Sequence, residues 1–103
     1  MKKSTIVVQP LEGPESATIR STEPVVLGSD ASCDYSVEAP GVSKQHAEVY
    51  RVGDLWWVRD LGTDDGTYLD GDIIEAEPVP RKAVLELGTD GIALLLKPDV
   101  LDR

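Results

Sequence analysis

The feature that most constrains this fold is the repeated alternation of short apolar runs with turn-forming residues. The runs are rich in Val, Ile, Leu and Tyr, and pairs of Gly, Pro and Asp residues separate them along the chain. Such runs are too short for typical helices and have the composition of strands. About ten strands at this spacing indicate an all-β sandwich or barrel. The expected strands cover residues 5–8, 17–21, 25–27, 35–37, 46–52, 55–61, 67–69, 73–74, 83–87 and 92–96.

Turn residues predict three hairpins within this pattern. Residues 53–54 (Gly-Asp) join two alternating runs, residues 70–71 (Asp-Gly) give the strongest short hairpin signal, and residues 88–91 join the last two runs. Trp56 and Trp57 are adjacent within one predicted strand. Because successive side chains of a strand alternate, we expect one of these tryptophans in the core and the other on the opposite face.

Length and charge restrict the class of protein. The chain has 103 residues, which suits a single domain over residues 1–103 with a core roughly at 5–97. The net charge is −9. Nucleic acids and anionic membrane surfaces bind clustered Lys and Arg, so we expect no nucleic-acid partner and no direct membrane contact.

The single cysteine, Cys33, excludes an internal disulfide and fits a reducing compartment. The apolar runs at residues 4–10 and 92–97 are too short for a signal sequence or a membrane span. We therefore expect a cytoplasmic protein. The chain stops abruptly after Arg103, which is compatible with one domain cut from a longer protein.

Three motifs in a fixed order indicate a family. They are VVLGSDASCD at 25–34, GVSKQHAEVY at 41–50 and DLGTDDGTYLDGD at 60–72. Together they resemble the forkhead-associated (FHA) domain, whose pattern runs LGR..SCD, VSR.HAE and DLGSTNGTYVNG. The resemblance implies a β-sandwich of about eleven short, mostly antiparallel strands. It also implies a signalling module whose loops at one end bind phosphothreonine peptides, without a cofactor.

The first two motifs match the family's phosphate-binding residues only in part. Gly28 matches the family glycine, but Ser29 stands where the family has the arginine that grips the phosphate. Ser43 matches the phosphate-binding serine, and Lys44 stands where a basic residue is common. His46 matches the family histidine, for which the resemblance implies a structural role.

The third motif differs more strongly. Thr63, Asp64 and Asp65 replace the Ser-Thr-Asn of the family, whereas Gly66 and Thr67 match it. Asp64 replaces the family threonine that donates a hydrogen bond to the phosphate, and Asp65 replaces the asparagine whose amide holds the peptide backbone. Two like charges about 6 Å apart at an effective dielectric of about 20 repel by roughly 3 kcal/mol, which is about a hundredfold in affinity.

These differences predict a protein-interaction module with a degenerate phosphopeptide site. We expect a protein or peptide partner, basic or phosphorylated, that is bound independently of phosphothreonine. The expected ligand-binding residues are Ser29, Ser43, Lys44, Asp64, Asp65 and Thr67, and the expected structural residues are Gly28, His46 and Gly66.

Two alternatives remain open. In the first, Ser29, Ser43, Lys44 and Thr67 suffice for a working phosphothreonine reader. In the second, Asp64, Asp65 and Asp70 bind a cation in a regulatory domain, although the EF-hand pattern fails before Gly66 and we expect no metal site.

Catalysis is not expected. Ser43 and the single histidine, His46, are three residues apart and would face opposite sides of one regular strand. Asp30 and Asp34 lie near Cys33 in the sequence and should raise the pKa of its thiol, which makes it a poor nucleophile.

Overall fold

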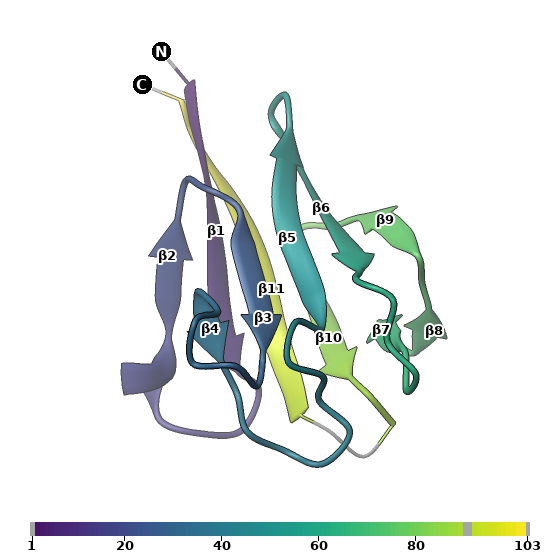
Figure 1. Cartoon of the computed structure of the whole chain (residues 1–103). Coiled ribbons are helices and arrows are strands. Elements are labelled where there is room, and N and C mark those ends of the chain that lie inside the picture. The colour runs from purple at the N-terminus through teal and green to yellow at the C-terminus, as the bar shows by residue number, and fades with distance from the viewer. Residues whose placement is uncertain (1, 90–91, 103) are drawn as a thin grey trace.

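Eleven strands form two facing sheets in the computed structural model, which describes residues 2–89 and 92–102 (Figure 1). The all-β sandwich predicted from the sequence is confirmed. The strands are β1 (Lys2–Pro10), β2 (Ile19–Ser21), β3 (Val25–Gly28), β4 (Tyr35–Ser36), β5 (Ala47–Val52), β6 (Leu55–Asp60), β7 (Thr67–Leu69), β8 (Asp72–Ile73), β9 (Ala76–Pro78), β10 (Ala83–Leu87) and β11 (Ile92–Asp102).

One sheet has the strand order β2-β1-β11-β10-β7-β8, and the other has the order β4-β3-β5-β6-β9. All neighbouring strands pair antiparallel except β3 and β4, which are parallel. Strands β8 and β9 are therefore the edge strands of different sheets, and residues 74–75 join them directly. The chain passes from one sheet to the other at this side of the sandwich.

Alternate residues of both sheets fill the space between them, as a half-buried strand requires. Ile6 and Val8 of β1 are fully buried, and Trp56 and Val58 of β6 face them from the other sheet within one apolar cluster. Trp57 is only half-buried, so the predicted division between the two tryptophans is confirmed. The core therefore fixes the register of both sheets.

The turn at residues 70–71 has the backbone that its sequence predicts. Asp70 has φ of 51° and Gly71 has φ of 92°, and two positive φ values are characteristic of a type I′ hairpin turn. The hairpins at residues 53–54 and between β10 and β11 are also present, although residues 90–91 of the second turn lie outside the described part.

Four elements differ from the sequence prediction: β1, β2, β9 and β11. Residues 15–17 form a short 3-10 turn, so β2 begins only at Ile19. Strand β9 was not predicted, because its residues Ala76, Glu77 and Pro78 are all unfavourable for a strand. It forms at a sheet edge, where a proline is tolerated. Strands β1 and β11 are both longer than predicted, because Lys2–Pro10 pairs with residues 94–102.

Within residues 2–89 and 92–102, no helix is long and apolar enough to span a membrane.

Candidate functional site

Three loops gather at one end of the sandwich, away from the end where β1 begins and β11 finishes (Figure 1). They are the β3–β4 loop (residues 29–34), the β4–β5 loop (residues 37–46) and the β6–β7 loop (residues 61–66). We call them the apical loops. Every ligand-binding residue predicted from the sequence except Thr67 lies in one of them.

The first two apical loops are joined by backbone hydrogen bonds. The amide of Ser29 donates to the carbonyl of Ser43 at 2.9 Å, and the amide of Asp30 donates to the carbonyl of Lys44 at 3.2 Å. This close approach requires a glycine at position 28, because a Cβ there would lie 2.1 Å from the carbonyl oxygen of Lys44. The loops therefore place Ser29 beside Ser43.

His46 joins the β4–β5 loop to the β6–β7 loop. Its side chain is fully buried. Nδ1 accepts the backbone amide of Ser43 at 3.1 Å, so the ring proton is on Nε2, which donates to the carbonyl of Gly66 at 2.7 Å. The carbonyl of His46 also accepts the amide of Leu61 at 3.0 Å. Each bond has a backbone partner, so the histidine braces the loops and presents no free nitrogen to a ligand.

Asp60 organises the base of the β6–β7 loop. Its Oδ2 accepts the amides of Gly62 (2.9 Å) and Thr63 (3.0 Å), and its Oδ1 accepts the hydroxyls of Thr63 (2.6 Å) and Thr67 (2.7 Å). The Thr63 hydroxyl in turn accepts the amide of Gly66 at 3.0 Å. The loop is therefore held around one carboxylate.

These donors also set the protonation of Asp60. Burial alone would raise the pKa of its carboxyl group, but hydrogen bonds from Thr63, Thr67 and Gly62 hold the pKa below its ordinary value. Asp60 is therefore an ionised structural residue. This role was not predicted from the sequence, although an Asp two residues before a Gly-Thr pair is typical of a side chain that caps a turn.

Thr67, expected among the ligand-binding residues, has no exposed surface and donates its hydroxyl to Asp60. We therefore assign it to the loop scaffold. The other five expected residues reach the surface. Asp64, Asp65 and Lys44 are exposed, and Ser29 and Ser43 are half-buried beside one another.

The apical end has a strong negative charge. Residues 28–46 contain three carboxylates and residues 60–67 contain three more, whereas these two segments contain one lysine, Lys44, and no arginine. The carboxylate of Asp65 points towards the β4–β5 loop, since its Oδ2 would lie 3.2 Å from a Cβ added to Gly41. A phosphate approaching Ser43 would therefore meet negative charge on the facing loop.

Cys33 donates its thiol to the carbonyl of Lys44 at 3.0 Å. Burial raises the pKa of this thiol, a backbone hydrogen bond involving Asp30 lowers it, and the charges of Asp30 and Asp34 raise it further, with a net increase. The predicted direction is confirmed. The thiol therefore links the β3–β4 loop to the β4–β5 loop and is weakly nucleophilic.

Asp70 is used by the fold, because its Oδ1 accepts the amide of Val84 at 2.8 Å. Among residues 2–89 and 92–102, no three His, Cys, Asp or Glu side chains are grouped closely enough to hold a metal ion.

Comparison with known proteins confirms the family that the motif order indicates. Residues 25–88 match the family model described as the FHA domain. Two curated relatives, both named FHA domain-containing protein FhaB and from two strains of Mycobacterium tuberculosis, are 32% identical over 75 residues. The match covers 72% of this chain and 48% of each relative, so the chain spans about half the length of the curated relatives it matches.

Solved structures share the fold. The FHA domain of the CT664 protein from Chlamydia trachomatis has a TM-score of 0.78 at 24% identity, with 90% of this chain and 96% of that chain covered. A domain from a structural and functional study of phosphothreonine-dependent FHA interactions has a TM-score of 0.80 at 19% identity, with 90% and 95% covered.

Proposed function

Because the chain belongs to the FHA domain family, we propose that it is a protein-interaction module that binds its partner without phosphothreonine. FHA domains are interaction modules that typically bind phosphothreonine peptides. Here Ser29, Asp64 and Asp65 replace the family's arginine, threonine and asparagine. The proposal includes the absence of catalytic activity and, because Cys33 is a free thiol, a cytoplasmic setting.

The observation that supports this proposal is the contrast between an ordered loop scaffold and an altered loop surface. The hydrogen bonds of His46 and Asp60 hold the apical loops in place. The exposed positions that should meet a phosphate instead have carboxylates or a neutral hydroxyl. A rigid, negatively charged surface favours a basic partner segment over a phosphorylated one.

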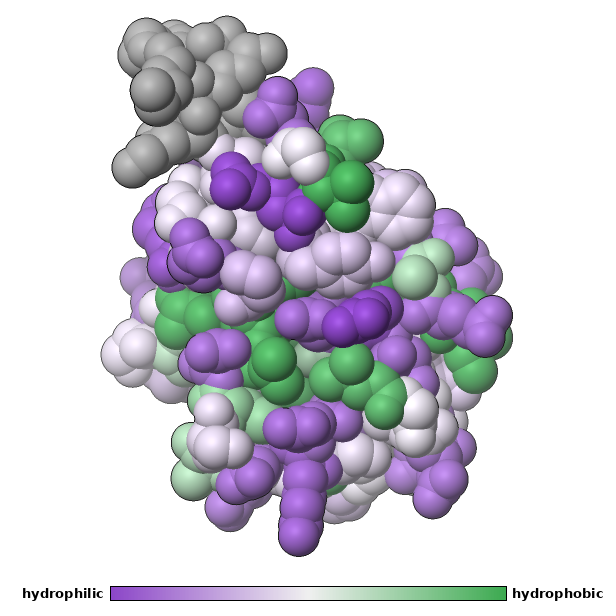
Figure 2. Space-filling model, turned by 45° about the horizontal axis from the view of Figure 1, so that its top comes forward, coloured by the Kyte–Doolittle hydropathy of each residue, from purple (hydrophilic) through white to green (hydrophobic). Residues whose placement is uncertain are grey.

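The apical loops are a better candidate than the broad sheet surface. On the face seen in Figure 2, apolar side chains form several separate patches between hydrophilic residues. Arg59 on the outer face of β6 is already paired with Glu48 at 2.6 Å and lies 5.4 Å from the ring centre of Tyr50. The charges of Arg59 and Glu48 are therefore already paired within the domain.

The decisive variant restores the family residues by Ser29→Arg, Asp64→Thr and Asp65→Asn. An arginine bound to phosphate contributes about 1.5–3 kcal/mol. Removing each carboxylate contributes about 0.2–1 kcal/mol, which is less than the roughly 3 kcal/mol expected from the sequence, because Asp64 and Asp65 are exposed and water and salt screen their charges. The sum of about 2–5 kcal/mol predicts an affinity for phosphothreonine peptides that rises roughly 30-fold to several-thousand-fold. The assay is titration with paired phosphorylated and unphosphorylated peptide libraries.

A matched control is Thr22→Arg, Glu23→Gln and Asp54→Asn. These substitutions change the net charge by the same amount (+3) at exposed positions in the β2–β3 and β5–β6 turns. The control variant should gain no phosphate dependence. If the restored variant also binds phosphorylated and unphosphorylated peptides equally, these three side chains do not account for the lack of phosphate binding, and the charge argument fails.

One observation favours a second candidate function, a working phosphothreonine reader. The backbone bond between Ser29 and Ser43 places two hydroxyl-bearing residues side by side, next to Lys44. If these residues bind phosphate, Ser43→Ala should abolish phosphate-dependent binding in the native domain. An undiminished affinity in Ser43→Ala would exclude this reading.

A further inference from the structure

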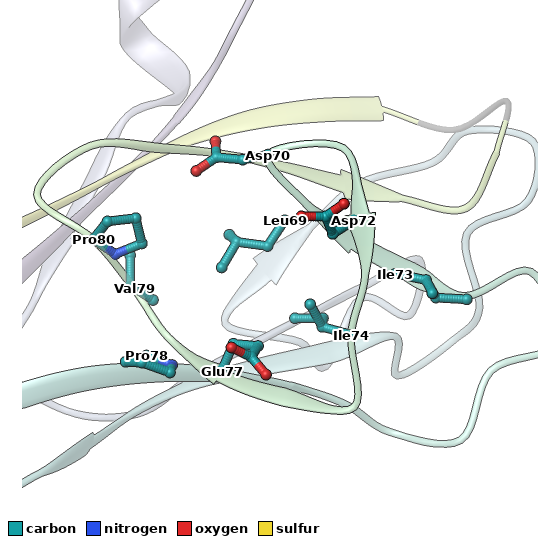
Figure 3. A pocket seen from close by; sticks show the side chains of 9 residues that line it. All are labelled: Leu69, Asp70, Asp72, Ile73, Ile74, Glu77, Pro78, Val79 and Pro80. Atoms are coloured by element: carbon teal, nitrogen blue, oxygen red, sulfur yellow. The ribbon is translucent and has the colours of Figure 1, made fainter.

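A groove on the side of the sandwich has features of a second docking surface, separate from the apical loops. Residues 69–80 enclose a cavity of about 470 Å³ between the edge strands β8 and β9 (Figure 3). We call it the β8–β9 groove. In Figure 3, Leu69 and Ile74 point into the ring that this segment forms, while Asp72 and Glu77 lie on its rim.

The groove has an apolar floor with an acidic rim. Leu69, Ile74 and Val79 line it and are more than nine-tenths buried, whereas Asp72 and Glu77 are exposed. More of the surface that lines the groove is polar than apolar, so charged and polar groups of a partner would make most of the contacts there.

Ile73 provides an observation that does not depend on charge. Ile73 is 67% exposed, which is the largest exposed fraction among the large apolar residues of the described part of the chain. It borders the β8–β9 groove and a second hollow of about 580 Å³ that reaches Asp64 and Gly66 of the β6–β7 loop. Ile73 therefore lies between the two hollows, and in Figure 3 its side chain points outward from the ring that holds the groove.

The charge around the groove favours a partner with basic residues. Between Arg59 and Arg81 the sequence has seven carboxylates and no Lys or Arg. Within the part of the chain that the structure describes, the one ion pair found joins Arg59 to Glu48, so Asp72 and Glu77 have no internal cation. An extended segment with lysine or arginine would neutralise these rim charges on binding.

A partner in this groove would be recognised through side-chain contacts more than through backbone pairing with an edge strand. Pro78 lies in the edge strand β9 and has no amide hydrogen, and β8 has only the two residues Asp72–Ile73. Both features limit the backbone pairing that an incoming strand could make.

We propose that the β8–β9 groove binds an extended, unphosphorylated peptide segment whose basic and apolar residues are two positions apart, so that their side chains point to the same face. The basic side chains pair with Asp72 and Glu77, and an apolar side chain contacts Ile73. This goes beyond the function proposed for the apical loops, because it uses residues 69–80 and stands even if the apical loops bind nothing.

The test begins with selection of a random, unphosphorylated peptide display library against the full chain. The expected peptides have Lys or Arg two positions away from Leu, Ile, Val or Phe. Binding of a selected peptide should fall about tenfold in Asp72→Asn/Glu77→Gln and about threefold or more in Ile73→Ser. These side chains are exposed, so thermal stability should stay unchanged.

Matched controls separate the groove from general attraction to an acidic protein. Glu15→Gln/Glu23→Gln removes two exposed carboxylates beside β2, at the opposite edge of the sheet from β8, and Leu55→Ser replaces an apolar residue that is 64% exposed. Both controls should keep native affinity. Equal losses in groove and control variants, or no enrichment of basic-apolar peptides, would overturn the proposal.

An apical variant distinguishes failure of this proposal from failure of the proposed function. Selected peptides should bind Ser43→Ala with native affinity. If Ser43→Ala weakens binding and Asp72→Asn/Glu77→Gln does not, the peptides bind the apical loops and the groove is not their site.

Discussion

Replacing Asp60 with asparagine should destabilise the domain by removing the charge that four donors share. Those donors are the amides of Gly62 and Thr63 and the hydroxyls of Thr63 and Thr67. An asparagine offers one acceptor oxygen, so two donors lose their acceptor and must turn or remain unpaired. The Thr67 hydroxyl has no access to water because the residue is fully buried.

The magnitude follows from the bonds that are lost. Hydrogen bonds to a charged group contribute about 1.5–3 kcal/mol each, and partial re-pairing by the new amide offsets some of that. We expect Asp60→Asn to lower the free energy of unfolding by about 2–4 kcal/mol. For a domain of this size, that is a fall in Tm of roughly 10–25 °C.

The pH dependence gives an independent check. Because hydrogen bonds lower the pKa of Asp60 in the folded domain, its stabilising contribution is complete above the unfolded pKa of about 3.9. The contribution is lost as the pH falls through the lower pKa of the folded state. The stability difference between native and Asp60→Asn domains should therefore be constant near neutral pH and shrink in acid.

Urea unfolding followed by circular dichroism, repeated from pH 7 to pH 3, measures both effects. Asp64→Asn is the control, because Asp64 lies in the same loop with an exposed side chain and should change stability by less than about 0.5 kcal/mol. An Asp60→Asn domain as stable as the native one would refute this account of the loop. So would a stability difference that does not change with pH.

The remaining predictions concern the close contacts between the apical loops. Gly28→Ala should lower the free energy of unfolding by about 3 kcal/mol or more, because the new Cβ would lie 2.1 Å from the carbonyl oxygen of Lys44. Gly53→Ala, whose Cβ meets nothing within 4 Å, should cost only about 1 kcal/mol for its positive φ, and equal losses would contradict the packing argument. His46→Ala should cost about 2–4 kcal/mol and speed amide hydrogen exchange in both loops that the imidazole joins, and unchanged exchange would contradict its bracing role.

The sequence predicted the strands whose patterns are local. Alternation and turn residues were enough for β5, β6 and their hairpin, because these depend on neighbours in the chain. They were not enough for β9, whose pairing with β6 supplies what its own residues lack. The far end of β11 also escaped prediction. Leu96 is the last residue of β11 that pairs with β10. Beyond it, residues such as Pro98, which pairs with Ile6, have a neighbouring strand on one side only.

The candidate site was predictable in its motif positions and less so in the state of each side chain. The motif order placed Ser29, Ser43 and the β6–β7 loop at one end. Thr67 could be read equally as a ligand donor or as a scaffold residue. The structure shows that the Thr67 hydroxyl already donates a hydrogen bond to Asp60, seven residues earlier in the chain. Side-chain burial of this kind depends on contacts between distant residues, which local pattern does not record.

The β8–β9 groove could not have been inferred from the sequence. Its acidic residues read as a solvated surface, since nothing local shows that residues 69–80 enclose a cavity. The concave shape arises because the chain crosses between sheets at residues 74–75, which is a property of the topology.

The most direct test of the altered apical site is a titration of the native domain with a phosphothreonine peptide library and its unphosphorylated counterpart. Isothermal calorimetry or fluorescence anisotropy at physiological salt gives both affinities under one condition. The carboxylates of Asp64 and Asp65 and the missing guanidinium at position 29 predict that phosphorylation will not strengthen binding. Micromolar binding that requires the phosphate and disappears in Ser43→Ala would contradict this account.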